Sequence, residues 1–192
     1  MNLNEKPVRE KYKEFYGSNT EQMELLIKDN RIPLSIKQII ERRLNSKQND
    51  WKDNYFDTCD ACVYGEDGKF KIVKNSEKLL KMTPITELKD GGILVAKSFY
   101  EKLKSKEFSQ DTPKEKIWKE LLNELYEPYI KMLGYCPDVY FNKDDVFCIR
   151  AFYIRRLVSW SRVYGRSSLH GDGVRLVGLA SEMQTESGDK GA

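Results

Sequence analysis

The hydrophobic pattern of this 192-residue chain changes its period near Thr58, and this change most constrains the fold. Before Thr58 the apolar residues recur every three or four positions, as on one face of a helix. From there the stretch CVYGEDGKFKIV alternates like two strands around a turn at Glu66, Asp67 and Gly68. A chain with both periods is neither all helix nor all sheet, so the sequence predicts an α+β fold.

Two helix starts lie in the first quarter of the chain. Asn19 is placed as the N-cap of one helix, and Ser35 with Gln38 gives the capping-box spacing of a second. Pro33 must end the first helix before the second begins. These signals predict an N-terminal helical hairpin over about residues 19–45.

The C-terminal half is expected to hold two long helices, over about residues 113–165. Thr112 and Pro113 give the start signal of the first helix, and Gly134 is placed to end it. The second helix is expected after Asn142, where apolar residues again recur at helical spacing. Helices therefore dominate the predicted fold.

A chain of this length fits one domain, expected here over residues 1–180. Its middle, about residues 55–108, reads as mixed α/β, and a closing strand is expected at about 174–180. Residues 181–192 are polar and small, which is typical of a disordered tail. The prediction is a mostly helical α+β domain with a small antiparallel sheet or hairpin.

The composition is that of a globular protein, with 40% hydrophobic and 33% charged residues. The net charge of +3 comes from 33 basic and 30 acidic residues, so any phosphate or nucleic-acid site would need a local basic patch. No stretch approaches the roughly 18 consecutive apolar residues that a membrane span needs, and no secretory signal is evident. The expected protein is cytoplasmic and does not bind membranes.

Four cysteines in such a chain are expected to be reduced thiols. Cys59 and Cys62 have the spacing that lets two thiolates share a metal ion or form a redox pair. However, Cys136 and Cys148 do not supply a second half-site, so the preferred interpretation is small buried side chains. His170 is the single histidine, which excludes sites built on two imidazoles. No metal and no cofactor is predicted.

The segment RAFYIRRLVSWSRVYGR, residues 150–166, carries five arginines, whereas residues 44–149 contain seventeen lysines and no arginine. If the segment is helical, Arg155, Arg162 and Arg166 align on one outer face. Arginine differs from lysine in gripping a phosphate or carboxylate with two parallel hydrogen bonds. The face would then bind nucleic acid or an acidic protein, unless the domain's own acids already neutralise it.

The second N-terminal helix adds candidates for nucleic-acid contact. Lys37, Gln38 and Arg42 lie on its outer face, where a helix-turn-helix unit would place residues that read bases. The alternative is an ordinary packing hairpin. The sequence thus favours a small non-enzymatic module that binds nucleic acid, with an adaptor that docks an acidic protein through the same arginine face as the alternative.

The acidic and aromatic stretch DWKDNYFDTCD, residues 50–60, has two interpretations. As an internal partner of the arginine segment, it would bring Asp53 or Asp57 to Arg150 or Arg156. As part of an enzyme, the two aspartates would flank a small-molecule cleft with the single histidine. No motif supplies a nucleophile, metal or cofactor site, so no catalytic residue is predicted.

Overall fold

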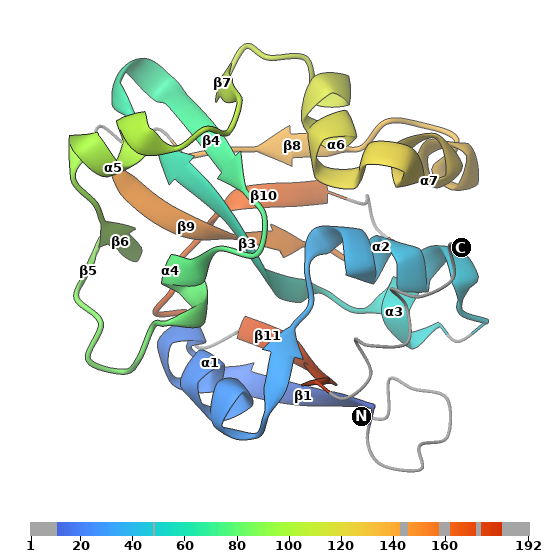
Figure 1. The fold of residues 1–192 in the computed structure, drawn as a ribbon. Helices are drawn as coiled ribbons and strands as arrows, with labels where there is room; N and C mark the ends of the chain where they lie inside the picture. Colours follow the sequence, from blue (N-terminus) through green and yellow to red (C-terminus); the bar gives the residue numbers. More distant parts are fainter. Residues whose placement is uncertain (1–10, 48, 143–145, 158–161, 172–173, 182–192) are drawn as a thin grey trace, which may run out of the picture.

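A computed structural model describes residues 11–47, 49–142, 146–157, 162–171 and 174–181. Within these ranges the chain is mainly β-sheet, with short helices around it (Figure 1). The helices are α1 (Asn19–Lys28), α2 (Ile36–Asn45), α3 (Asp50–Asp53), α4 (Glu77–Leu80), α5 (Lys97–Lys102), α6 (Lys114–Leu122) and α7 (Tyr126–Leu133), with 3-10 turns at Glu66–Gly68 and Asn123–Leu125. The strands are β1 (Tyr12–Gly17), β2 (Arg31–Pro33), β3 (Phe56–Tyr64), β4 (Lys69–Val73), β5 (Leu88–Lys89), β6 (Gly92–Leu94), β7 (Glu107–Ser109), β8 (Asp138–Tyr140), β9 (Cys148–Ile154), β10 (Arg162–Ser167) and β11 (Val174–Ala180).

The described strands form two sheets. The larger runs in the order β5-β6-β9-β3-β4-β7, with β10 antiparallel beside β9 and β8 parallel to β10. The smaller runs β1-β11-β2, so the first and last described strands pair antiparallel from Tyr12 opposite Leu179 to Gly17 opposite Val174. Figure 1 shows β1 and β11 side by side below the larger sheet. This pairing brings the two ends of the domain together.

The prediction of a mostly helical domain was wrong, and the error lies mainly in the second C-terminal helix. The chain there forms β9 and β10 instead; residues 143–145 and 158–161 of the expected helix lie outside the described ranges. Strand β9 is buried along nearly all its length, so no alternation of polar and apolar residues marks it as a strand. Its β-branched and aromatic residues, Ile149, Phe152, Tyr153 and Ile154, nevertheless favour a strand.

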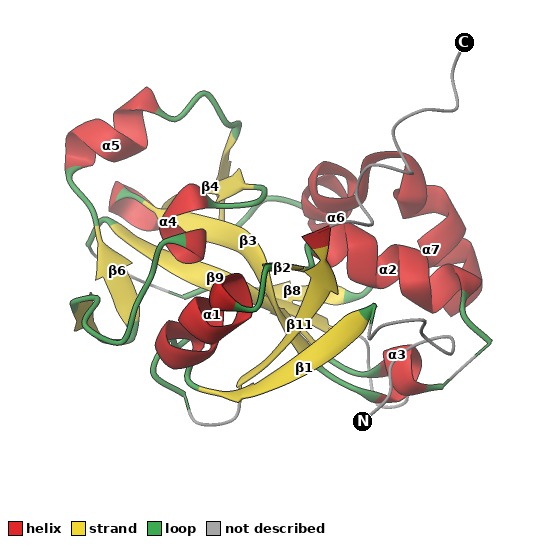
Figure 2. Cartoon of the chain, turned by 60° about the horizontal axis from the view of Figure 1, so that its bottom comes forward, coloured by secondary structure: helices red, strands yellow, loops and turns green. Residues whose placement is uncertain are grey.

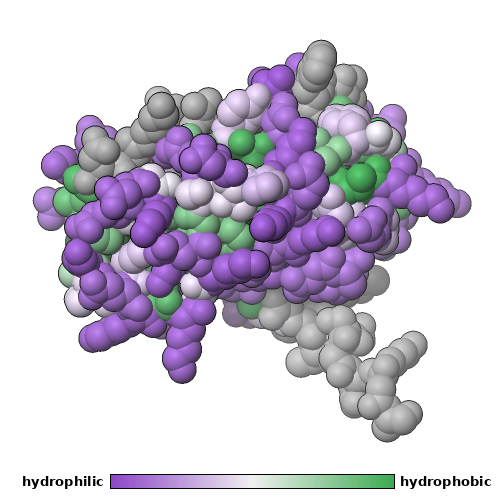
Figure 3. Space-filling view, turned by 90° about the horizontal axis from the view of Figure 1, so that it is seen from above, coloured by the Kyte–Doolittle hydropathy of each residue, from purple (hydrophilic) through white to green (hydrophobic). Residues whose placement is uncertain are grey.

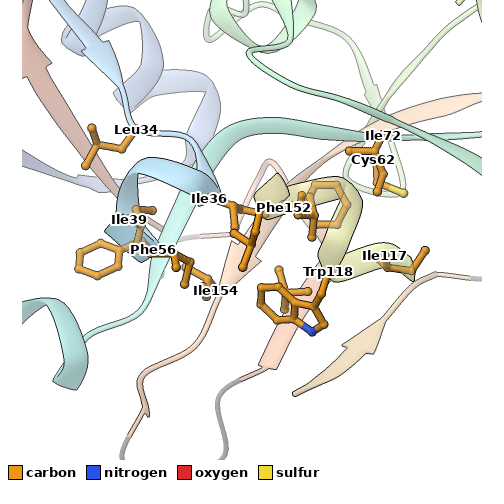
Figure 4. Close-up of a cluster of buried hydrophobic side chains, with 14 of the residues drawn as sticks. Leu34, Ile36, Ile39, Phe56, Cys62, Ile72, Ile117, Trp118, Phe152 and Ile154 are labelled. Atoms are coloured by element: carbon orange, nitrogen blue, oxygen red, sulfur yellow. The ribbon is translucent and has the colours of Figure 1, made fainter. Parts of the chain in front are cut away.

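Helices cover the larger sheet on both faces. Figure 2 shows α2, α6 and α7 gathered on one side of the molecule and α1, α4 and α5 on the other. The first group buries one core cluster, in which Ile36 of α2 and Trp118 of α6 meet Phe152 and Ile154 of β9 (Figure 4). The second cluster includes Ala151 of β9 and side chains of α1 and α4. Alternate residues of β9 therefore serve opposite faces.

Local signals fix several helix ends. The capping box predicted at Ser35 and Gln38 is present, and Ser35 Oγ accepts from the Gln38 backbone N–H. The first helix is capped by Ser18 instead of Asn19, whose side chain is buried against the larger sheet. The first expected C-terminal helix is broken at Asn123, where a φ of 52° is incompatible with a continuous helix. The apolar pattern alone predicted neither the cap of the first helix at Ser18 nor the break at Asn123.

The surface seen in Figure 3 is predominantly hydrophilic, with apolar side chains scattered between charged ones. In the described part of the chain, no helix has both the length and the apolar character needed to cross a membrane.

Candidate functional site

A row of polar and aromatic side chains crosses strands β3, β9, β10 and β8 of the larger sheet. Asp57 of β3 lies opposite Tyr153 of β9, Tyr153 opposite Tyr164 of β10, and Tyr164 opposite Tyr140 of β8. Directly paired residues share one face of a sheet, so the row lies on the same face. The ring centroids are 5.7 Å apart for Tyr153 and Tyr164 and 5.1 Å apart for Tyr164 and Tyr140, where the rings stack. The aromatic contacts hold the three tyrosines as one layer.

A second row lies two residues further along the same strands. The backbone N–H of Arg155 donates to the carbonyl oxygen of Arg162 over 3.0 Å, and Arg162 lies opposite Asp138 of β8. Because side chains two apart on a strand share a face, both arginines lie beside the tyrosines. We call Tyr140, Tyr153, Tyr164, Arg155 and Arg162 the tyrosine-arginine face.

Part of the tyrosine-arginine face lines a shallow cavity of about 380 Å³ that is open to solvent. Its described lining consists of Tyr153, Arg155, Tyr164 and Ser167. All four side chains come from β9, β10 and the residue after β9, and all are half-buried. The sheet backbone therefore fixes the cavity walls, while their outer atoms remain accessible to a ligand.

The two arginines of this face differ in their partners. Arg155 hydrogen-bonds the side chain of Tyr153, and among the described residues it forms no ion pair with an acid. The Arg162 guanidinium lies 5.4 Å from the Tyr140 ring centroid and hydrogen-bonds Tyr164, which is the main reason its pKa is raised. Burial raises the pKa of Tyr153, which keeps its hydroxyl neutral. Arg155 is also the arginine of this face that belongs to the described cavity lining.

Asp57, at the β3 end of the first row, is buried, with 2% of the residue exposed. Its Oδ1 accepts from Ser167 Oγ at 2.6 Å and from Asn19 Nδ2 at 3.4 Å, and the carboxyl also accepts a backbone N–H of Arg175. Burial raises the pKa of Asp57 to about 6, although these three hydrogen bonds act in the opposite direction. Asp57 forms no ion pair with an arginine side chain in the described ranges, so its partners are not those expected from the sequence.

Two further arginines of the segment lie in strands β9 and β10. Arg150, expected to meet Asp53 or Asp57, is buried and donates to the carbonyl oxygen of Asp90 over 2.8 Å. Arg166 lies in β10, within the irregular stretch between Tyr164 and Ser167. Three outer arginines were predicted to align on one helix face. The structure shows two of them, Arg155 and Arg162, close together, and the pairing of β10 with β9 brings them there.

The candidate nucleic-acid readers on α2 have other roles in the structure. Lys37 pairs with Glu124 over 2.5 Å, Gln38 completes the capping box, and the Arg42 guanidinium lies 5.1 Å from the Tyr12 ring centroid. Helix α2 packs against α6 and α7 on the sheet face opposite the tyrosine layer. The structure does not bring these residues together with Arg155 and Arg162. The arginine-lined helix on which the nucleic-acid prediction depended is replaced by β9 and β10, so that prediction loses the arrangement from which it was made.

The remaining candidates are two buried cysteines and an exposed histidine. Cys59 is buried, and its Sγ donates to Asn75 Oδ1 at 3.1 Å, while burial raises its pKa and disfavours a thiolate. Cys62 is buried in the first core cluster. His170 is exposed in a turn after β10. Across the described ranges, no three His, Cys, Asp or Glu side chains are placed to share a metal ion.

Sequence reasoning missed the tyrosines, although a signal was present. Tyr and a charged residue alternate in three short stretches: Tyr153 with Arg155, Arg162 with Tyr164, and Asp138 with Tyr140. A period of two indicates strands that present one polar aromatic face. The helical spacing of the neighbouring apolar residues obscured it.

No family model and no curated protein matches this sequence. Among solved structures, one described as "Accommodation of massive sequence variation in Nanoarchaeota by the C-type lectin fold" superposes with a TM-score of 0.62 at 15% sequence identity. The alignment covers 91% of this chain and 100% of that one. At this identity the likeness establishes architecture and not activity. It agrees with the sheet-rich structure and again contradicts the mostly helical prediction: the chain adopts the C-type lectin fold.

Proposed function

We propose that this protein is a binding module that docks an acidic segment of a protein partner on its tyrosine-arginine face. The observation that carries the proposal is Arg155, which lines the cavity and has no ion-pair partner among the described acids. A carboxylate is the group that a guanidinium binds with two parallel hydrogen bonds.

The composition of the face supports a protein partner. Tyrosine and arginine are enriched among the residues that contribute most to protein interfaces, because each offers a large contact area together with polar groups. Here the rings of Tyr140, Tyr153 and Tyr164 are already ordered by contact with one another. Less side-chain freedom is then lost when a partner binds.

The architecture also supports a binding role. The C-type lectin fold of the nanoarchaeal structure is described as accommodating massive sequence variation. In this chain, Phe152 and Ile154 face the core while Tyr153 and Arg155 face the cavity. Because the two sets alternate along one strand, the outer set can change without disturbing the packing beneath it.

A display experiment tests this proposal. A library of peptides is selected against the immobilised protein, and the affinity of each recovered peptide is measured by calorimetry. We expect acidic sequences to be enriched, and Arg155→Ala to weaken their binding about tenfold or more. Arg156→Ala is the matched control, because Arg156 is the exposed neighbour outside the cavity lining.

A second pair of variants compares a tyrosine of the tyrosine-arginine face with an exposed tyrosine outside it. Tyr164→Ala should weaken binding, whereas Tyr135→Ala, which changes a 44% exposed tyrosine outside the face, should not. The proposal fails if selected peptides lack acidic residues or bind the Arg155 variant equally well. It also fails if the face retains DNA or RNA in a salt-dependent manner and no acidic peptide, since that result would identify a nucleic-acid surface.

A further inference from the structure

A buried carboxyl and a cavity-lining hydroxyl form a pair at the base of the tyrosine-arginine face. Ser167 lines the cavity, and its Oγ is 2.6 Å from Oδ1 of Asp57. Asp57 is 2% exposed and does not line the cavity itself. Among the described cavity-lining side chains, Ser167 is the one that hydrogen-bonds Asp57, so its hydroxyl is the direct link between the buried carboxyl and a ligand.

The groups that surround Asp57 come from several elements. From α1, Asn19 Nδ2 donates at 3.4 Å, and from β11 the backbone N–H of Arg175 donates. The Arg175 guanidinium pairs with Glu14 of β1 at 2.8 Å. From β9, Tyr153 lies directly opposite Asp57, with Arg155 two residues further along. The direct hydrogen-bond partners are thus neutral donors, and the nearby charged groups are Arg155, Arg175 and Glu14.

The charge on Asp57 determines what Ser167 offers to the cavity. An ionised carboxylate only accepts hydrogen bonds, and a hydroxyl has one proton to donate. With Asp57 ionised, the Ser167 proton is held in a charge-assisted bond of 2.6 Å, and the free lone pairs of Oγ are left for the ligand. With Asp57 protonated, the bond is weaker, and the Ser167 proton is free to turn towards the cavity.

We infer that Asp57 is a specificity-determining residue that makes Ser167 a hydrogen-bond acceptor, so that the cavity selects a carboxylate accompanied by an N–H or O–H donor. The inference rests on the proposed function, in which Arg155 takes the carboxylate. An aspartate residue with its own backbone amide has both groups. Asp57 acts by positioning the Ser167 proton and does not touch the ligand.

The preference depends on pH in a defined direction. Burial raises the pKa of Asp57 to about 6, so the carboxyl is ionised at pH 8 and protonated at pH 5. Aspartate carboxylates in a small probe titrate near 3.9 and remain mostly ionised at pH 5. Selection of a donor group is therefore expected at pH 8 and lost at pH 5.

Two small probes test the inference directly. N-acetyl-aspartate carries an amide N–H next to its carboxylates, and O-acetyl-malate replaces only that N–H with an ester oxygen. The affinity of the full chain for each is measured by NMR titration at pH 8 and pH 5. We expect about a fivefold preference for N-acetyl-aspartate at pH 8, the effect of one hydrogen bond, and no preference at pH 5.

Variants assign the effect to the proposed pair. Ser167→Ala should bind both probes equally at both pH values, whereas Ser168→Ala, the exposed neighbour, should behave like the wild type. Asp57→Asn should lose the pH dependence of the preference. Circular dichroism confirms that each variant is folded, and if Asp57→Asn does not fold, the wild type and Ser167→Ala comparison still decides. His170→Gln is a further control, because His170 is the single histidine of the chain.

The outcomes separate the two proposals. Equal binding of both probes at pH 8, abolished by Arg155→Ala, would overturn the role of Asp57 and leave the acidic-partner function standing. Binding of neither probe, or binding unaffected by Arg155→Ala, would overturn the carboxylate site and this inference with it. A preference that persists in Ser167→Ala would show that another group selects the donor.

Discussion

Nη2 of Arg43 donates to the carbonyl oxygen of Arg155 over 2.8 Å, which joins α2 to the end of the strand that carries the tyrosine-arginine face. Arg43 is fully buried, and its guanidinium also donates to the carbonyl oxygens of Trp51 and Asn54 at 2.8 and 3.1 Å. With the Arg155 N–H bonded to Arg162, both backbone groups of Arg155 are held. Arg43 thus fixes the backbone from which the cavity arginine projects.

Arg43→Met should destabilise the protein by about 3 kcal/mol or more, because it leaves three carbonyl oxygens without their donor in the interior. Arg43→Lys should recover little, since an ammonium cannot reproduce the planar fork of donors. Urea unfolding measures both. Arg42→Ala is the matched control and should cost below about 1 kcal/mol, the scale of a partly exposed cation-π contact. Equal losses at positions 42 and 43 would contradict the assigned role.

Asp57 should make stability fall as pH rises. Its folded pKa of about 6 lies above the ordinary value of 3.8, so between these values the folded state binds more protons than the unfolded state. The stabilising contribution is complete below about pH 4 and is lost as pH rises through 6. The size is roughly 3 kcal/mol. Urea unfolding at pH 4 and pH 8 should show this loss in the wild type relative to Asp57→Asn; parallel pH profiles of the two proteins would refute it.

The buried ion pair of Arg175 and Glu14 joins the last and first described strands. Its atoms are 2.8 Å apart, and the side chains are 6% and 4% exposed. Arg175→Met should cost about 3 to 5 kcal/mol, because Glu14 is left charged in the interior. Adding Glu14→Gln should restore part of the loss. Thermal and urea unfolding of the single and double variants form the cycle that measures the coupling, and strict additivity would rule out an interacting pair.

Gly165 of β10 is required for space. A Cβ at this position would lie 2.9 Å from the Phe141 ring and 3.1 Å from Cys62. Gly165→Ala should therefore cost about 1 to 3 kcal/mol, and Phe141→Leu in the same chain should relieve part of it. Gly134→Ala gives a useful contrast, because nothing lies near its Cβ but its φ is +78°, so its cost is conformational and Phe141→Leu should not relieve it. Equal relief at both glycines would disprove the steric account.

Short-range signals predicted several elements correctly. Ser35 and Gln38 form the expected capping box, the hairpin around Glu66, Asp67 and Gly68 joins β3 to β4, and a strand covers residues 174–180. Each depends on hydrogen bonds or backbone conformations among residues close in sequence. Such features depend on a few consecutive residues and need no distant partner.

Local signals did not predict the structure of the segment from Arg150 to Arg166. Its arginines were expected to align along a helix, and Arg155 and Arg162 do lie together, but across two paired strands. Both arrangements bring residues seven apart in sequence close to each other. The apolar residues fit a helical period because β9 is buried on both faces, which removes the alternation that would have identified the strand.

The sequence by itself determined the local elements, the basic character of the segment from Arg150 to Arg166 and the alternation of tyrosine with charged residues. Only the tertiary structure decided which strands pair, and hence that Asp57 lies under Ser167 and Arg43 beneath Arg155. The physical reason is that strand pairing and burial depend on groups far apart in the chain. No local pattern specifies them, and they set both the cavity and the pKa of the carboxyl at its base.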